Sequence, residues 1–399
     1  MEEKEFDKTH IFGNSENSVI TENDFSKELL EPLLQKALHK EDRKISDLRV
    51  HVFARGPDIH HTPVASVIVH WEGSASSPQQ VIVKLPGKKE DDESVRSHDS
   101  ECNAYRLLYS KIGKSVVPIP TLHLSIKSTE PGRNIIIMEN LVGRAISPTF
   151  DEGLTNEQLH EIFDALADLH AFSLSNFTVK YQFPSVSRES FTVYERLWEK
   201  VIDLCREEFS DIFTFTDEEL QTYANMNDLY ERVAYTPKSD YTPVLVHGDL
   251  WTRNMLFSLD PKFSDKAGNK LLAILDWQSA HMGNLAEDMT NVLCWSCAPY
   301  LRQKYTQHML RRYYDRLSSK VQIVPFTMED VEHQYDKLLI NGAVNAMVQT
   351  GMMVCDGKLR HATNAERRQL MMRSITALAD AIKLRKIELS KPKPKKPDK

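Results

Sequence analysis

Residues 244–257 read Val-Leu-Val-His-Gly-Asp-Leu-Trp-Thr-Arg-Asn-Met-Leu-Phe, and residues 273–278 read Ala-Ile-Leu-Asp-Trp-Gln. Short apolar runs that contain β-branched or aromatic residues predict strands at 244–246, 255–259 and 271–275. The segment between the last two runs begins with Asp260-Pro261 and ends with Gly268-Asn269, which are turn-forming residues. We therefore expect these two strands to form a hairpin.

Oxygen-bearing side chains stand at the ends of these strands. Asp249 and Asn254 are close enough in sequence for a tight loop to bring them to one point, and Asp276 follows the hairpin. Two carboxylates and a carboxamide in one small volume favour a hard divalent cation between them. In phosphoryl transfer, one Asp of such a set receives the proton of the attacking hydroxyl, and the Asn and second Asp hold Mg²⁺ on the nucleotide phosphates. This order of residues is the catalytic and metal-binding layout of the protein-kinase-like fold. It predicts Asp249 as the base and Asn254 and Asp276 as metal ligands.

The His-Gly-Asp of residues 247–249, in place of His-Arg-Asp, resembles the aminoglycoside phosphotransferase and choline kinase superfamily. The fuller string continues with Asp276-Trp-Gln and with Gly-Asn-Leu-Ala-Glu-Asp at 283–288, and it resembles the ecdysteroid-kinase-like (CHK kinase-like) branch. The resemblance runs from about residue 45 to about residue 385. It implies an α+β, bilobal protein-kinase-like fold, with an antiparallel sheet in the small lobe and a large, mostly helical lobe.

The bulk composition is that of an ordinary globular protein. The chain has 399 residues, of which 41% are hydrophobic and 27% charged, and its net charge is -7. A general nucleic-acid binder would need a basic face. The acidic N-terminus is not followed by an apolar run, and no stretch is long enough to span a bilayer. Five scattered cysteines suggest reduced thiols. We expect a cytoplasmic monomer or weak dimer that binds neither nucleic acid nor membrane.

Lys84 lies inside the apolar run at residues 80–86. Burying an ammonium costs several kcal/mol unless an anion meets it, and nucleotide phosphates or a carboxylate would supply that anion. By resemblance, Lys84 pairs with Glu101 of the following helix, and both orient the phosphates. The alternative is an edge-strand lysine that points to water.

The strand at 134–138 runs into a connector whose backbone would hydrogen-bond the adenine in this fold, which makes Glu139, Asn140 and Leu141 the candidates. Loop 55–63 stands where a kinase has its phosphate-covering loop, but it holds a single glycine. Its His60-His61 pair is read as part of a solvated loop, because neighbouring residues rarely share one metal ion.

The predicted units are a small lobe at 1–141, a helical lobe at 142–390 and a disordered basic tail at 391–399. Near the start of the chain we expect a helix at 21–39, with Thr21 as its cap and Pro32 either kinking it or starting a second helix. In the large lobe, Thr155 and Gln158 form a capping box. Further helices are expected at 191–209 and 217–235. Four aromatic side chains there line an acceptor pocket or form ordinary core, and we favour core: Phe191, Tyr194, Trp198 and Phe209.

Three features refine the function. Trp251 takes the place where protein kinases often carry a lysine, so Mg²⁺ and Lys84 must neutralise the γ-phosphate. Asp288 by resemblance braces the catalytic loop. The segment that separates it from Asp276, residues 277–287, is too short to be a peptide-docking activation segment. The Cys294-x-x-Cys297 pair follows a helical pattern and is read as buried thiols.

We expect an enzyme that uses ATP and Mg²⁺ to phosphorylate the hydroxyl of a small-molecule acceptor. An apolar or steroid-like alcohol is one candidate acceptor, because the resemblance includes steroid phosphorylation. The alternative is a catalytically silent kinase-like module that binds a nucleotide or metabolite. The sequence does not choose the acceptor.

Overall fold

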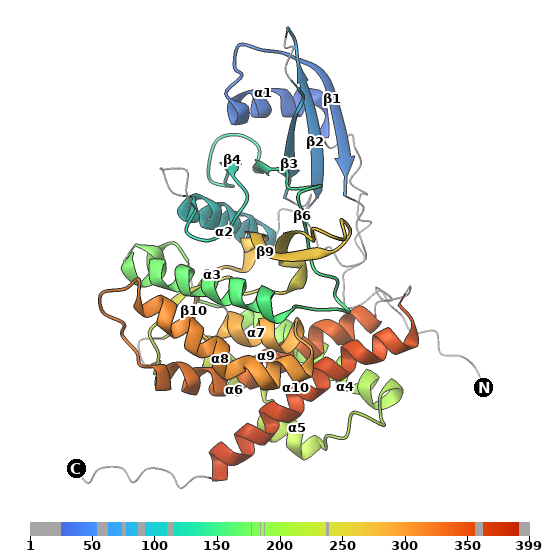
Figure 1. Ribbon diagram of the computed structural model, residues 1–399, viewed down its shortest axis with the longest axis vertical. Helices are drawn as coiled ribbons and strands as arrows, with labels where there is room; N and C mark the ends of the chain where they lie inside the picture. The colour runs from blue at the N-terminus through green and yellow to red at the C-terminus, as the bar shows by residue number, and fades with distance from the viewer. Residues whose placement is uncertain are drawn as a thin grey trace.

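The computed structural model describes residues 25–53, 63–73, 77–86, 92–109, 115–176, 178–183, 185–186, 188–236, 239–355 and 362–390. They form two lobes, with a sheet and one helix at one end and a group of helices at the other (Figure 1). This mixture of helices and antiparallel strands in two lobes confirms the expected fold class. Residues 55–62 of the predicted loop 55–63, which include its two histidines, and the tail 391–399 lie outside the described residues.

The small lobe is built on a five-stranded sheet of order β1-β2-β3-β5-β4, in which every pair is antiparallel. Its strands are β1 (Ile45–Val52), β2 (Val64–Trp71), β3 (Gln79–Lys84), β4 (Leu122–Ile126) and β5 (Ile135–Glu139). Burial alternates along β2, so one face of that strand lies in the core. β3 is the central strand, which rules out the alternative of an edge-strand lysine at position 84.

Helix α1 (Lys27–Leu38) is shorter than expected. Ser26 is its N-cap, because the Ser26 hydroxyl accepts a hydrogen bond from the Leu29 amide at 3.4 Å. Pro32 lies inside this one helix, so it does not start a second one. The cap expected at Thr21 lies outside the described residues.

The elements between the lobes carry the polar loops. Helix α2 (Asp92–Leu108) follows β3, and the predicted hairpin is confirmed as β8 (Met255–Leu259) and β9 (Ala267–Ile274), with β6 (Ala145–Ile146) beside β8. β7 (Val244–Val246) pairs with β10 (His281–Gly283), which closes the chain around the loop 247–254. One-turn 3-10 helices occur at η3 (Thr252–Asn254) and η4 (Trp277–Ser279).

The large lobe holds α3 (Asn156–Ser175), η2 (Val179–Tyr181), α4 (Arg188–Glu208), α5 (Asp217–Tyr223), α6 (Met226–Val233), α7 (Glu287–Trp295), α8 (Pro299–Ser318), α9 (Met328–Cys355) and α10 (Asn364–Ser390). The capping box of α3 is confirmed. The prediction of a single helix at 217–235 is wrong, because the helix is interrupted between α5 and α6. Asn225 caps α6 by accepting a hydrogen bond from the Asn227 amide at 3.0 Å. Cys294 and Cys297 are buried, as expected, and burial raises the pKa of each thiol to about 12.

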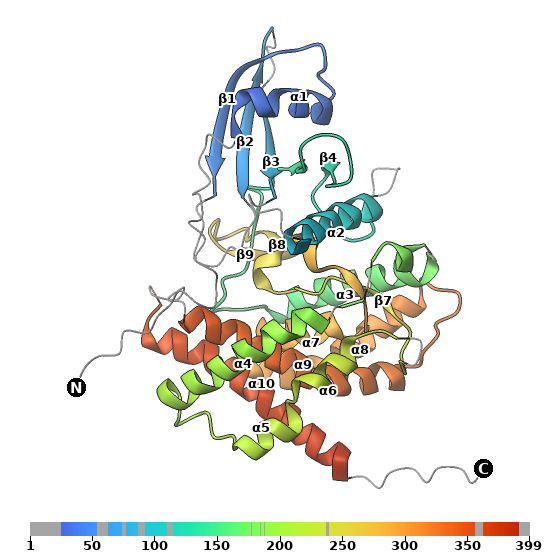
Figure 2. The same ribbon diagram turned by 180° about the vertical axis from the view of Figure 1, so that it is seen from behind.

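Helix α9 is the centre of the large lobe. It packs against α4, α6, α7 and α10, and Figure 2 shows α4 lying beside it. Two glycines permit the closest approaches. A methyl group on Gly342 would lie 2.7 Å from the Thr290 backbone carbon of α7, and one on Gly351 would lie 2.5 Å from a Val201 methyl group of α4.

In the described part of the chain, no helix is long and apolar enough to cross a membrane.

The close contact of α7 with α9 predicts that Gly342→Ala destabilises the fold. The new methyl group meets backbone, which cannot rotate away, and overpacking of this kind costs about 1–3 kcal/mol. Thermal unfolding should show a lower Tm than the wild type. His333→Ala, at an exposed position of the same helix, is the control and should change stability by about 0.5 kcal/mol or less. Equal Tm values for Gly342→Ala and the wild type would contradict the claim that the contact of α7 with α9 leaves no room for a methyl group at position 342.

Candidate functional site

Lys84, at the end of the central strand β3, is buried between two carboxylates. Its Nζ lies 2.6 Å from Glu101 Oε2 and 2.7 Å from Asp276 Oδ1. Burial alone would lower the pKa of Lys84, but the charges of Asp276 and Glu101 raise it overall. The lysine therefore stays charged, and it joins β3 and α2 of the small lobe to the end of β9. The structure brings the predicted Lys84 and Glu101 together, and adds Asp276 to the pair.

The loop 247–254 holds the predicted base beside the predicted amide ligand. The Asn254 Nδ2 group donates to the Asp249 backbone oxygen at 2.8 Å and to Asp249 Oδ2 at 3.2 Å. Burial, followed by the nearby charge of Asp276, raises the pKa of Asp249 to about 7. The two aspartates therefore lie close enough to repel each other.

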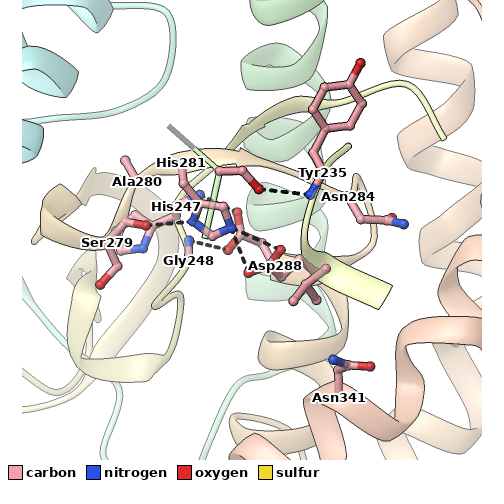
Figure 3. Close-up of polar contacts among 12 residues, drawn as sticks. Tyr235, His247, Gly248, Ser279, Ala280, His281, Asn284, Asp288 and Asn341 are labelled. Carbon is pink, nitrogen blue, oxygen red and sulfur yellow. Dashed lines mark hydrogen bonds and ion pairs between the residues drawn. The ribbon is translucent and has the colours of Figure 1, made fainter. Parts of the chain in front are cut away.

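The backbone of this loop is fixed from below by Asp288 on α7. The carboxylate of Asp288 accepts hydrogen bonds from the His247 amide at 2.7 Å and the Gly248 amide at 3.0 Å (Figure 3). The His247 ring donates from Nε2 to the Leu275 carbonyl at 2.8 Å and accepts from the Asp249 amide at Nδ1. Asp288 thus has the bracing contacts that were expected from the resemblance.

Two residues of the site have left-handed backbone conformations. Gly248 has φ 82°, and a methyl group there would lie 2.4 Å from the Ser279 carbonyl oxygen, so only glycine fits. Asp276 has φ 64° and ψ 60°, which is unusual for a residue with a side chain. Backbone strain of this kind persists where surrounding contacts fix it, and here the ion pair with Lys84 does so.

These groups line one large cavity, of about 1790 Å³, whose walls come from both lobes. Lys84, Glu101, Asp249, Asn254 and Asp276 all contribute to its lining. In the described residues, no cluster of three or more His, Cys, Asp and Glu side chains could hold a metal on its own.

The connector residues are placed differently from one another. Glu139 and Leu141 line the cavity, whereas the Asn140 side chain donates to the Ser66 hydroxyl at 2.8 Å. The Glu139 amide already donates to the Thr121 carbonyl at 2.9 Å. Of the three predicted adenine-binding residues, Glu139 and Leu141 therefore line the cavity, while the Asn140 side chain is engaged with Ser66.

The four aromatic candidates divide between the two roles considered for them. Phe191 and Tyr194 line the cavity, while Trp198 and Phe209 are buried in the core. The preference for core was therefore right for two of them only.

Trp251 also lines the cavity, and its ring stacks on Trp295 with centroids 4.2 Å apart. The place of the usual kinase lysine is thus taken by part of an aromatic wall.

The sequence interpretation missed an ion pair at the cavity wall, between His281 and Glu287. The His281 ring donates from Nδ1 to the Ser279 carbonyl at 2.9 Å (Figure 3). Its Nε2 lies 3.2 Å from Glu287 Oε1. Burial opposes the charge, but Glu287 and the carbonyl outweigh it and raise the pKa of His281 to about 9. Pairing of β10 with β7 places His281 beside the loop, and only knowledge of that register could have identified it.

This ion pair predicts a stability difference that depends on pH. Because the pKa of His281 is higher in the folded protein than in the unfolded chain, its contribution is complete below about pH 6.5 and disappears as pH rises through about 9. The difference in unfolding free energy between wild type and His281→Gln should therefore shrink from about pH 6 to about pH 10. Chemical denaturation at several pH values measures it, with His333→Gln as the exposed control. A difference that stays constant over this range would contradict the assigned charge.

A family model described as "DUF1679: Uncharacterized oxidoreductase dhs-27" matches residues 70–386. Two curated proteins from Caenorhabditis elegans are similar. "Uncharacterized oxidoreductase dhs-27" is 26% identical over 231 residues, which are 55% of this chain and 27% of that protein. "Uncharacterized kinase-like protein D1044.1" is 22% identical over 235 residues, which are 57% of this chain and 58% of that protein. The matched part is thus less than two thirds of the length of either relative.

Among solved structures, the microcompartment-associated aminopropanol kinase superposes with a TM-score of 0.50 at 13% identity. The superposition covers 90% of this chain and 98% of that one, which shows that the two share a fold. The family model spans most of the chain, including Lys84, Glu101, Asp249, Asn254 and Asp276. The chain belongs to the DUF1679 family.

Proposed function

We propose that this protein is an ATP- and Mg²⁺-dependent phosphotransferase that phosphorylates the hydroxyl group of a small molecule. The observation that carries the proposal is the meeting of five polar side chains in one interlobe cavity, with Lys84 held between Glu101 and Asp276 and with Asp249 beside Asn254. This combination matches the parts that phosphoryl transfer requires: a cation for the phosphates, oxygen ligands for Mg²⁺, and a base.

The donor set fits a magnesium ion. Asn254 uses its Nδ2 group for Asp249, which orients its Oδ1 atom for a ligand role. Burial, and after it the charge of Asp276, raises the pKa of Asp249, and a cation between the two side chains would relieve the part that is due to Asp276. Mg²⁺ is commonly held by one or two carboxylates together with substrate phosphates, so three acidic ligands are not needed. When bound, the ion would neutralise charge on the transferred phosphoryl group.

Each remaining residue has a role that follows from its contacts. Lys84 binds the phosphates, and Glu101 fixes the position of its ammonium group. Asp249 accepts the proton of the acceptor hydroxyl, for which a pKa near neutrality is well matched. Asp288 is a positioning residue, because its carboxylate holds the backbone of the loop and does not line the cavity.

Two features favour a small acceptor. Between Asp276 and Asp288 the chain forms only η4, β10 and a short loop, which offers no extended segment for docking a peptide. The cavity also continues from the candidate catalytic residues into the helical lobe. The resemblance to the ecdysteroid-kinase-like branch makes an apolar or steroid-like alcohol a candidate. A small acceptor is also consistent with the aminopropanol kinase that shares this fold, which is named for a small amino alcohol.

Two other functions deserve comparison with this one. A silent binding module would keep the cavity but has no need for a base beside the metal ligands. The name oxidoreductase belongs to a relative of which this chain matches 27%. The described strands pair only in antiparallel fashion, so the parallel sheet that binds dinucleotides is absent from the described residues.

The test of the proposal is Asp249→Asn. The amide keeps the size of the side chain but cannot accept the proton, so hydrolysis of Mg-ATP, with water as acceptor, should fall by about 100-fold or more. Binding of Mg-ATP should be roughly retained. The Tm of the free protein should not fall, because the variant removes a buried charge.

Asp203→Asn is the matched control, since Asp203 is exposed on α4 and should leave turnover unchanged. Equal turnover in Asp249→Asn and the wild type would refute the assignment of the base. If the wild-type protein does not bind Mg-ATP, the proposed function itself is refuted.

A further inference from the structure

One row of side chains on α9 differs from the rest of that helix. Within residues 338–354, every position is buried except Asn341, Asn345 and Gln349, which are partly exposed. Positions four residues apart lie above one another on a helix, so the three carboxamides form one line. All three line the cavity. The exposure of this carboxamide row (Asn341, Asn345 and Gln349) is therefore to the cavity.

The row is part of a hydrogen-bond chain. Gln349 Nε2 donates to the Tyr194 hydroxyl at 2.8 Å, and that hydroxyl donates to Asn345 Oδ1 at 2.7 Å. Asn345 Nδ2 then donates to Asn291 Oδ1 of α7 at 3.1 Å. These contacts fix the orientation of each amide. A carboxamide has more donor and acceptor positions than these contacts use, so the chain can also bind a ligand.

Asn341 supplies an unmet acceptor at the end of the row. Its Nδ2 group donates to the Leu229 carbonyl at 2.9 Å, which fixes the amide orientation. Its Oδ1 atom is buried and accepts no hydrogen bond from the part of the chain that the structure describes. An unsatisfied buried acceptor is costly, so at this end of the row the free protein has a polar atom without a partner in the described part of the chain.

The row extends the candidate catalytic centre into the helical lobe. The charge of Asp249 contributes, after burial, to raising the pKa of Tyr194, so the phenol lies within electrostatic reach of the proposed base. The surrounding wall is apolar, with Phe191, Met226 and Val344 among its residues. A molecule placed with its hydroxyl at Asp249 would extend along the carboxamides and this apolar wall.

The charges nearby argue against a cationic ligand. A primary ammonium group transferred from water is stabilised best by a carboxylate that has no other partner. Of the acidic groups that line the helical part of the cavity, Glu287 is paired with His281, and Asp249 is beside Asn254 as the proposed base. The row itself consists of neutral groups that both donate and accept.

We propose that the carboxamide row, together with Tyr194 and Asn291, is the acceptor-recognition surface of this protein, and that it selects an uncharged molecule with an apolar skeleton and several hydroxyl or carbonyl oxygens. This inference rests on the proposed phosphotransferase function. It adds which residues choose the acceptor and which chemical class they choose.

The experiment compares two acceptor panels with Mg-ATP and the full-length protein. One panel holds neutral terpenoid diols and triols, andrographolide among them, and the other holds choline, aminopropanol and kanamycin. Mass spectrometry should detect phosphorylated products from the neutral panel only, and Asp249→Asn should form none. For the best neutral acceptor, Asn345→Leu should raise the acceptor KM by about 10-fold or more, because it also leaves Tyr194 and Asn291 without their hydrogen-bond partner. The kcat and the KM for ATP should change little.

Asn269→Leu, an exposed position of the β8–β9 hairpin, is the matched control and should leave both KM values unchanged. Phosphorylation of the cationic panel would overturn the inference and leave the proposed function standing. So would an unchanged acceptor KM in Asn345→Leu, or the absence of any neutral product from protein that hydrolyses Mg-ATP through Asp249. A protein that neither binds nor hydrolyses Mg-ATP would overturn both proposals. Thermal unfolding of each variant shows whether it has folded.

Discussion

The site depends on one buried ammonium group with two acidic partners. Lys84 extends from the central strand of the small lobe and meets Glu101 from α2 and Asp276 from the end of the β8–β9 hairpin. A buried charge without partners would be severely destabilising, so the three elements must stay together for the fold to tolerate this lysine. The same contact fixes Asp276 in a strained conformation next to Asp249. In this way the energetics of a single side chain hold the two lobes in the arrangement that the chemistry needs.

A second set of contacts makes the loop rigid before any ligand binds. Asp288 accepts two backbone amides, His247 bonds to the Leu275 carbonyl, and Gly248 allows the Ser279 carbonyl to approach closely. A preorganised loop does not have to be ordered when substrate arrives, and placing the base and the amide ligand accurately is a large part of phosphoryl transfer. The carboxylate of Asp249 is costly to the free protein, because burial and the nearby charge of Asp276 both disfavour its charge, and a cation would relieve that cost.

Much of this arrangement could be predicted from the sequence, because local signals specified it. The hairpin follows from apolar runs around a turn, and the capping box from Thr155 and Gln158. A lysine within a buried strand indicated that an anion must meet it, and the resemblance named Glu101 as that partner. Long-range contacts carry no such signal. The ion pair of Lys84 with Asp276 spans 192 positions, and the pairing of β10 with β7 is what places His281 beside the loop. The carboxamide row was hidden for another reason. A polar side chain that faces an internal cavity has the same pattern in sequence as one that faces solvent.

The most direct measurement of the central claim is calorimetric titration of the protein with ATP, with and without Mg²⁺, for wild type and Asp276→Asn. If Asp249, Asn254 and Asp276 surround one hydrated ion on the nucleotide phosphates, wild-type protein should bind ATP substantially more tightly with Mg²⁺. Asp276→Asn should lose most of that gain. ATP affinity that is the same with and without Mg²⁺, or a gain that survives intact in Asp276→Asn, would contradict this account.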